Sequence, residues 1–344
     1  MSVEIRASTP RDAAAIVDLL HGAGLAAQAE SRALHWKYWQ PRDDWSAPRS
    51  FVMERQGEVI AHAAVVPGAC AWPGHRMSVL HMVDWAASPG SVGAGLALAK
   101  SLRAYADALI AIDGSADTLR MLPAMGFRRC GTGTGYVRVL RPARYLTAQA
   151  GWGWKTVPKF LSRALWRLAA PDPAAEAGRA REIAPRELSV LEPVLPKLSG
   201  TTPIMERSLA LLRYMLDCPL AAMRLHAVEC GGALRGYFLL AIVPGQARLA
   251  DYWIDSEVIE DWKRLIQCAV ASAREIPDVV EVVAIASDPA LASALEDLGF
   301  HRRYEKPVQI LTRRGIEGPP ACPRVQMLES DGAYLHGGRP KFLA

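Results

Sequence analysis

The residues whose types and spacing best suit chemistry form a glycine-rich turn at positions 88–95, which reads Ser-Pro-Gly-Ser-Val-Gly-Ala-Gly. An apolar strand-like stretch ends before Pro89, and the apolar run after Gly95 predicts a helix. The first N–H groups of a helix have no partner within it, and the helix dipole makes that end positive. The turn is therefore predicted to hold a phosphate group through its backbone.

The composition predicts a globular protein with room for two domains, because the 344 residues are 51% hydrophobic and 22% charged, without long charge runs. The net charge of +5 is spread along the chain, which suits an anionic ligand better than a nucleic acid. The six cysteines and eight histidines lack metal-ligand spacing, so we expect no metal. No signal-peptide pattern and no run of about 18 apolar residues occurs, so we expect a cytoplasmic protein without a membrane span.

Alternation and periodicity predict a mixed α/β fold for residues 1–140. A strand and two helices precede three strands, which form an antiparallel meander ending with residues 77–86. A helix over 92–106 then leads to a strand at 108–113, and a crossover of that length predicts a parallel pair. A short helix and a closing hairpin, built from 128–130 and 136–140, complete the order.

The same order returns from residue 181, which predicts an internal duplication. The pairs Gly126-Phe127 and Gly299-Phe300 fall at the same point of each half, as do the Val-Pro-Gly breaks that begin at Val66 and Val243. The predicted organisation is an N-terminal domain at 1–140, a linker at 141–180, a second domain at 181–314 and an irregular surface tail at 315–344.

The linker contains a basic amphipathic segment at 154–168. Such a segment could cover one domain, dock an acidic acyl carrier protein or lie on a membrane surface. The sequence leaves these three interpretations open.

With these features together, the chain resembles a tandem protein of the GNAT superfamily of N-acyltransferases. The family signature is a strand followed by [Gln/Arg]-x-x-Gly-x-[Gly/Ala] at a helix start, and a later helix that ends in Gly-Phe; here the loop begins at Gly90. The resemblance implies an α+β fold with two GNAT-like domains, each a largely antiparallel mixed sheet flanked by helices. It also implies that acyl-coenzyme A, most simply acetyl-CoA, binds at Val83, Trp85, Ala86, Gly90, Ser91, Val92, Gly93, Ala94 and Gly95.

The chain departs from the family pattern at three places. Gly90 stands where the family has Gln or Arg, which removes a side chain but leaves the backbone amides. The family often places a Tyr four residues before Gly-Phe as the acid for the thiolate, and here that residue is Leu122. In the second half the stretch 255–261 has no glycine and four acidic residues, so we expect it to repel a pyrophosphate. We therefore expect one working site and one degenerate half.

Transfer of an acyl group from a thioester to an amine requires a group that removes the amine proton. The candidates on the strand before the loop are His81 and Asp84, and strand alternation places them on opposite faces unless a bulge intervenes. Tyr38 lies on the aromatic helix 31–39, where the family builds its acceptor side. Each of the three has a structural alternative: a core imidazole for His81, packing for Tyr38, and a structural hydrogen bond for Asp84, because Asp251 occupies a similar place in the second half.

The leading hypothesis is an enzyme that moves an acyl group from acyl-CoA to an amine of a small molecule or peptide. A second hypothesis keeps the fold and takes longer acyl or aminoacyl groups from a carrier protein or tRNA. A third is a non-catalytic GNAT-like binding module, favoured by Gly90, Leu122 and the degenerate second half. A dinucleotide-binding fold is disfavoured because the glycine turn follows a meander. The sequence does not indicate the oligomeric state.

Overall fold

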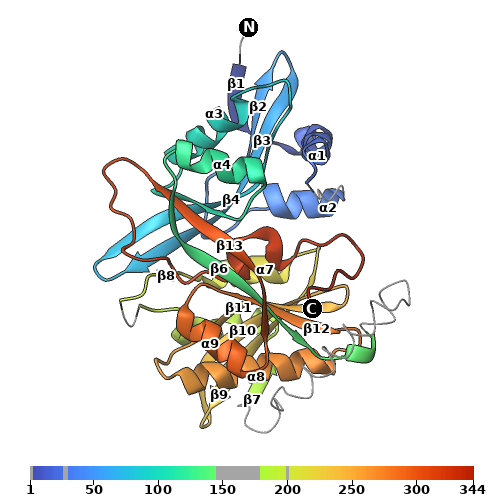
Figure 1. Cartoon of the computed structure of the whole chain (residues 1–344), viewed down its shortest axis with the longest axis vertical. Helices are drawn as coiled ribbons and strands as arrows, with labels where there is room; N and C mark the ends of the chain where they lie inside the picture. The colour runs from blue at the N-terminus through green and yellow to red at the C-terminus, as the bar shows by residue number, and fades with distance from the viewer. Residues whose placement is uncertain (1–2, 26–29, 145–178, 199–200) are drawn as a thin grey trace. The chain divides into compact units, whose positions relative to one another are not determined.

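The computed structural model of the chain describes residues 3–25, 30–144, 179–198 and 201–344 (Figure 1). Two compact units are present. Unit 1 comprises Met1–Gly131, Thr201–Pro219 and Pro307–Pro323, and unit 2 comprises Thr132–Gly200, Leu220–Lys306 and Arg324–Ala344. Segments 201–219 and 307–323, which the sequence division places in the second half, thus cluster with unit 1. The basic segment 154–168 lies outside the described residues.

Unit 1 is built on the mixed sheet that the sequence predicts. The antiparallel strands β1 to β4 pair in order, β4 pairs with β5 in parallel, and the last residues of β13 add an antiparallel partner to β5. The two-residue strand β8 pairs with β3. The strands are β1 (Val3–Ala7), β2 (Ser50–Arg55), β3 (Glu58–Trp72), β4 (His75–Ala87), β5 (Ala108–Ile112), β8 (Ile204–Met205) and β13 (His301–Thr312).

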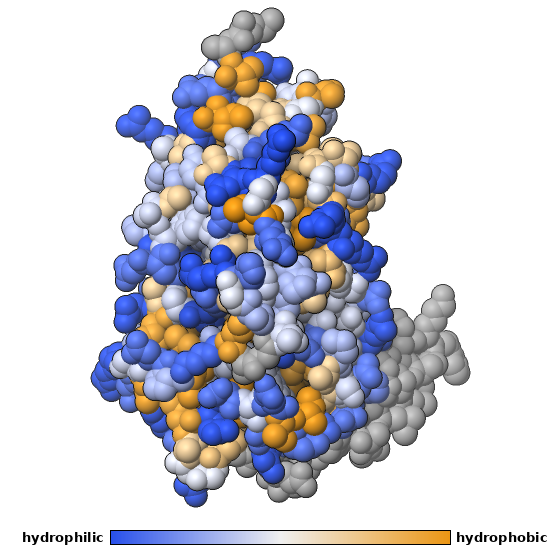
Figure 2. Space-filling model, turned by 90° about the vertical axis from the view of Figure 1, so that its left-hand side faces the viewer, coloured by the Kyte–Doolittle hydropathy of each residue, from blue (hydrophilic) through white to orange (hydrophobic). Residues whose placement is uncertain are grey.

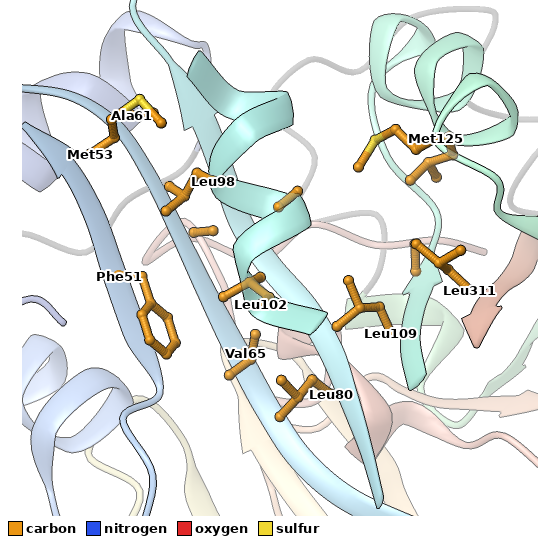
Figure 3. Packing of buried hydrophobic residues seen from close by; sticks show 14 of the residues in the cluster. Phe51, Met53, Ala61, Val65, Leu80, Leu98, Leu102, Leu109, Met125 and Leu311 are labelled. Carbon is orange, nitrogen blue, oxygen red and sulfur yellow. The ribbon is translucent and has the colours of Figure 1, made fainter. Parts of the chain in front are cut away.

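Helices cover both faces of this sheet. On one face α1 (Ala13–Gly22), α2 (Ser31–Leu34) and the π-helical turn His35–Trp39 pack against Val52. On the other face α3 (Ala94–Ser101) and α4 (Ala116–Ala124) enclose a larger apolar cluster. Figure 3 shows this cluster with Phe51, Val65, Leu80, Leu98, Leu102 and Leu109 directed between α3 and the sheet. The neighbours Phe51 and Val52 serve opposite faces, as strand geometry requires.

Helix α7 (Leu209–Leu216) is held in unit 1 by a buried aromatic residue, Tyr214. The Tyr214 ring stacks on Trp36 at a centroid distance of 4.7 Å. Its hydroxyl accepts a hydrogen bond of 2.7 Å from Arg49 Nη1, and the Arg49 guanidinium also lies 4.7 Å from the ring centroid. Stacking, a charged hydrogen bond and a cation–π contact therefore converge on one residue.

Unit 2 repeats the plan, with strand order β6-β12-β11-β10-β9-β7. The pair β11–β12 is parallel, and the other pairs with recorded register are antiparallel. Helix α8 (Ile259–Glu275) joins the two parallel strands and α9 (Pro289–Asp297) follows β12. The strands are β6 (Arg128–Val139), β7 (Arg179–Glu182), β9 (Ala222–Cys230), β10 (Ala233–Val243), β11 (Gln246–Ile254) and β12 (Glu281–Ala286).

The predicted closing hairpin is wrong, because residues 128–139 form the single strand β6. The alternating glycines Gly131, Gly133 and Gly135 lie within this strand and leave room for neighbouring side chains. A Cβ atom on Gly135 would lie 2.1 Å from Tyr304 Cζ, and one on Gly133 would lie 3.3 Å from Ile285 Cγ2. These glycines therefore allow close approach rather than reversal of the chain.

The tail differs from the expected surface segment. Residues 324–344 include the short 3₁₀ turns Met327–Glu329 and Asp331–Ala333, and many of their side chains are buried, among them Val325, Met327, Leu328 and Tyr334. The polar side chain of Arg248 on β11 donates hydrogen bonds to the carbonyls of Gly332 and Leu335. The tail is therefore part of the packed structure of unit 2.

In the described part of the chain, no helix is both long and apolar enough to cross a bilayer. On the face drawn in Figure 2, hydrophobic residues occur in small groups among hydrophilic ones.

Candidate functional site

The candidate site begins at a β-bulge near the end of β4. Register pairs His62 with Ala86 and Ala64 with Val83, so Asp84 and Trp85 together oppose one residue of β3. Asp84 has a φ of +47°, in the left-handed region that non-glycine residues seldom adopt. The bulge that the sequence analysis allowed for interrupts the alternation here: Asp84 contacts the α2 side, with Val83, and Trp85 packs on the α3 side.

The pairing of β4 with β5 ends before the bulge. The recorded parallel pairing covers only Val79 to His81 against Ala108 to Ile110, although β4 continues to Ala87. Residues 82–87, which we call the donor edge, therefore have no recorded strand partner on the β5 side. Every second residue of such an edge presents its N–H and C=O groups to whatever lies there. A ligand carrying amide groups could extend the sheet at this position.

The glycine loop follows the donor edge, and its three glycines differ in role. Gly93 has a φ of +82° and is the N-terminal cap of α3. A Cβ atom on Gly90 or Gly93 would meet no heavy atom within 4 Å, so the backbone is open there. Gly95 is packed instead: its carbonyl accepts a hydrogen bond from Trp85 Nε1, and a Cβ would lie 3.2 Å from that nitrogen.

The Ser91 side chain is turned into the loop. Ser91 is 5% exposed, and its Oγ accepts hydrogen bonds from Ser88 Oγ at 2.9 Å and Arg55 Nη2 at 3.1 Å. Because these hydrogen bonds engage the hydroxyl, we expect the backbone of Ser91, rather than its side chain, to contact the phosphate. Val92 is 99% exposed, so its side chain lies on the surface of the loop, while Ala94, the first residue of α3, is buried.

The bulge carries a buried charged cluster. Asp84 Oδ2 lies 2.5 Å from Lys37 Nζ and 2.6 Å from the Tyr38 hydroxyl, which donates to it. Burial alone would raise the pKa of Asp84, but the Lys37 ammonium and the two hydrogen bonds outweigh it and hold that pKa below its usual value. Asp84 is therefore ionised at neutral pH and paired to a cation.

A chain of hydrogen bonds fixes the backbone at the same point. The Asp84 carbonyl can only accept, so His62 Nδ1 donates to it at 2.9 Å, and His62 Nε2 accepts from Ser50 Oγ at 2.9 Å. Ser8 Oγ donates to Ser50, and Trp39 Nε1 donates to Ser8. The directions agree along the whole chain and require a neutral His62, whose pKa burial lowers to about 4.

The comparisons with known proteins rest on structure. No protein-family model matches the chain, and no curated protein matches it in sequence. A GCN5-related N-acetyltransferase from Anabaena variabilis aligns over 90% of this chain and 72% of its own, with a TM-score of 0.57 and 11% identity. N-myristoyltransferase from Saccharomyces cerevisiae with bound myristoyl-CoA aligns over 90% and 82%, with a TM-score of 0.60 and 12% identity. A putative acetyltransferase from Pyrococcus horikoshii aligns over 98% and 96%, with a TM-score of 0.52 and 12% identity.

The chain has the GNAT fold. The expected fold class, with two GNAT-like mixed sheets, is thereby confirmed. At 11–12% identity these structures indicate the fold alone, so the chemistry of the site has to be inferred from its own residues.

Within this GNAT fold, His81 forms none of the hydrogen bonds of the Asp84 cluster. It is 3% exposed, and neither ring nitrogen has a hydrogen-bond partner among the described residues. Burial, together with the charge of Arg207, lowers its pKa to about 3. A Cβ atom on Gly68 would lie 4.0 Å from His81 Nε2 and 3.7 Å from Met205 Cε, so this part of β3 packs close to the ring. A buried neutral imidazole without a partner is unusual, and its lowered pKa makes it a weak base.

The structure thus joins two of the three predicted catalytic residues, Asp84 and Tyr38, and leaves His81 separate. Sequence reasoning missed Lys37 and His62, although Lys37 is the direct neighbour of Tyr38. Leu122 is fully buried in the α3–α4 cluster, so that position contributes packing and no proton. In the described residues no three metal-ligating side chains gather into a possible metal site.

Proposed function

We propose that the chain transfers an acyl group from acyl-CoA to an amine of a small molecule or peptide. The observation that carries this proposal is the continuity of the donor edge with the glycine loop: an unpaired strand edge, a bulge and an open helix start follow one another within residues 82–95. The edge suits the amide groups of a pantetheine arm, and the helix start suits a pyrophosphate.

The bulge supplies the group that would stabilise the reaction. When bound, the donor supplies an activated thioester carbonyl. Backbone N–H groups released from pairing at the bulge would donate to the carbonyl oxygen as negative charge develops on it. Because Asp84 is held by Lys37, Tyr38 and His62, these donors are fixed before substrate arrives.

The charged cluster supports a positioning role for Asp84. A carboxylate with a lowered pKa that is already paired with an ammonium group is a weak base. Asp251 in unit 2 likewise accepts a hydrogen bond from a tyrosine hydroxyl, that of Tyr237 at 2.8 Å. His81 is also a weak base, because burial lowers its pKa, but neither of its ring nitrogens is engaged by another described residue, so it is the candidate to take a proton from the incoming amine, directly or through water.

The leaving thiolate needs little assistance. A thiol has a pKa of about 8.5, so its anion leaves near neutral pH without a dedicated acid. Leu122 in place of a tyrosine is therefore compatible with turnover. We propose acetyl as the simplest acyl group, with longer chains as the alternative because N-myristoyltransferase is among the similar structures.

The test compares two glycines with the same backbone conformation. Gly93 and Gly74 have φ of +82° and +75°, and a Cβ on either would meet nothing within 4 Å. Gly93→Glu places a carboxylate at the proposed pyrophosphate site, and Gly74→Glu places it in the β3–β4 turn. We expect acetyl-CoA at 100 times its Kd to stabilise the wild type and the Gly74→Glu variant by about 2.7 kcal/mol, measured as a thermal shift. The Gly93→Glu variant should show no shift.

A series of acyl-CoA chain lengths extends the same measurement, and the chain length giving the largest shift indicates the donor. Absence of any shift in the wild type with acetyl-CoA, longer acyl-CoA and free CoA would contradict the proposal and favour the non-catalytic module. A transfer assay with a panel of amines then identifies the acceptor class.

A further inference from the structure

Unit 2 retains the strand geometry of the donor edge. Register pairs Leu239 with Asp251 and Leu240 with Leu249, so β11 has a bulge at Ala250, as β4 has at Asp84. The recorded parallel pairing of β11 with β12 ends at Leu249, although β11 continues to Ile254. Residues 250–254, which we call the β11 edge, therefore correspond to the donor edge of unit 1.

The chain's own tail lies on the β11 edge. Gln326 Oε1 accepts a hydrogen bond of 2.7 Å from the Tyr252 N–H, and Gln326 Nε2 donates one of 2.8 Å to the Tyr252 carbonyl. The carboxamide thus meets both backbone groups of one residue, as a peptide unit of an added strand would. Gln326 is 5% exposed, so these bonds are shielded from water.

Neighbouring residues fix this segment on both sides. The Val325 N–H donates to Ser287 Oγ at 2.8 Å, and Val325 is fully buried. Arg324 forms a 2.9 Å ion pair with Asp288, and its guanidinium lies 4.8 Å from the Trp262 ring centroid and 5.4 Å from that of Trp253. The Gln326 N–H donates to Glu329 Oε2.

The helix start beyond the β11 edge carries acids in place of glycines. Asp261, in the first turn of α8, accepts a hydrogen bond from Ser256 Oγ at 2.6 Å, and Glu260 precedes it. A second anion at this helix start would meet like charge. Unit 2 thus retains an unpaired strand edge that could bind an amide group, but the helix start that follows it is too acidic to bind a phosphate.

We propose that the β11 edge is a peptide-binding site occupied by the chain's own segment 324–329, with Gln326 standing where an acyl donor's amide would bind. This inference rests on the proposed function for the meaning of the donor edge, and on the contacts of Gln326 and Arg324 for its occupant. The chain accordingly has a single donor site, in unit 1, and uses the tail to complete unit 2.

The experiment removes the carboxamide from the full chain. Gln326→Ala deletes it, and Gln326→Met deletes it with less loss of volume in case the alanine variant fails to fold. Gln309→Ala is the matched control, because Gln309 is 6% exposed and belongs to unit 1. We expect hydrogen exchange in peptides covering 250–254 to rise at least about tenfold in the Gln326 variants and to remain unchanged in the control.

Donor stoichiometry supplies the second readout. Titration calorimetry with acetyl-CoA should give one site per chain in the wild type and in the Gln326 variants, and none in Gly93→Glu. Unchanged exchange at 250–254 would overturn the proposed occupation, and donor binding that survives Gly93→Glu would overturn the single site. If the wild type binds no donor while exchange still rises, the proposed function fails and the occupation of the β11 edge stands.

Discussion

At the scale of single residues, the site depends on a buried ion pair held beside a strained backbone. Asp84 in the left-handed region costs about 1–3 kcal/mol, and such a conformation persists only where its surroundings enforce it. Lys37 and Tyr38 bind the carboxylate while His62 binds the carbonyl. Both Asp84 and Tyr38 could be selected from sequence, since Asp84 is a polar group on the strand before the glycine turn and Tyr38 lies on the aromatic helix where the resemblance places the acceptor side.

Lys37 could not be selected in the same way. Consecutive residues of an α-helix point about 100° apart, so Lys37 and Tyr38 would not be expected to reach one carboxylate. Both nevertheless contact Asp84 Oδ2, from a turn that is π-helical over residues 35–39. His62 was missed for a related reason: on the strand pattern it is an ordinary core position, and its partner is a carbonyl whose place the bulge determines.

We expect His81→Leu to separate catalysis from stability. A buried imidazole without partners destabilises the folded state, so leucine should leave stability at pH 7.5 unchanged or raise it by about 1 kcal/mol. If His81 accepts the amine proton, acyl transfer should fall by about 100-fold or more. An exposed histidine, His75, provides the control variant His75→Leu. Full activity of His81→Leu would contradict the role proposed for this residue.

The same variant changes the pH dependence of stability. The folded pKa of His81, about 3, lies below the unfolded value near 6.5, so the unfolded state binds the proton more tightly. Its contribution to stability is complete above pH 6.5 and is lost as the pH falls toward 3. Urea unfolding at pH 7.5 and 4.5 should therefore show a smaller loss in His81→Leu than in the wild type, by roughly 2 kcal/mol. An identical loss would show that His81 is not buried in a neutral form.

At the scale of elements, the strand-turn-helix unit around the glycine loop was predictable because its signals are local. A strand stops, glycines provide the turn, and apolar periodicity starts α3. The predicted hairpin is wrong at strand β6, where the sequence has alternating glycines. Such glycines are compatible with a turn and equally with a strand that a large side chain approaches closely. Only the position of Tyr304, which is distant in sequence, decides between them.

Gly135 should accordingly tolerate no side chain. A Cβ there would lie 2.1 Å from Tyr304 Cζ, so Gly135→Ala has to displace an aromatic ring. We expect a loss of about 1–3 kcal/mol in the free energy of unfolding, measured with urea. The double variant with Tyr304→Ala should lose less than the sum of the two single variants, because the clash is then absent. Strict additivity would indicate that the ring does not occupy this space.

At the scale of the molecule, the sequence predicted two related halves but not the exchange of segments between them. The local pattern of α7 or of the end of β13 is satisfied equally by either sheet, so periodicity cannot say which sheet each one joins. The decision comes from side chains such as Tyr214, which meets Trp36 and Arg49 of the first half. In the same way the tail was misjudged because proline and glycine content indicates irregular structure, which in this protein is also buried.

This exchange makes unit 1 dependent on the second half of the sequence. A fragment of residues 1–144 would leave the Arg49 guanidinium without the Tyr214 hydroxyl and ring, and the β5 edge without residues 308–312 of β13. The Arg49 guanidinium would keep its hydrogen bonds to the carbonyls of Trp36 and Gln40, but the loss of the Tyr214 contacts and an uncovered apolar strand edge both oppose folding. We expect fragment 1–144 alone to show no cooperative melting by circular dichroism and no thermal shift with acetyl-CoA. When it is refolded together with fragment 179–344, which carries α7 and β13, cooperative melting should return. A fragment 1–144 that melts cooperatively by itself would show that the first half forms a complete domain and that the exchanged segments only add to it.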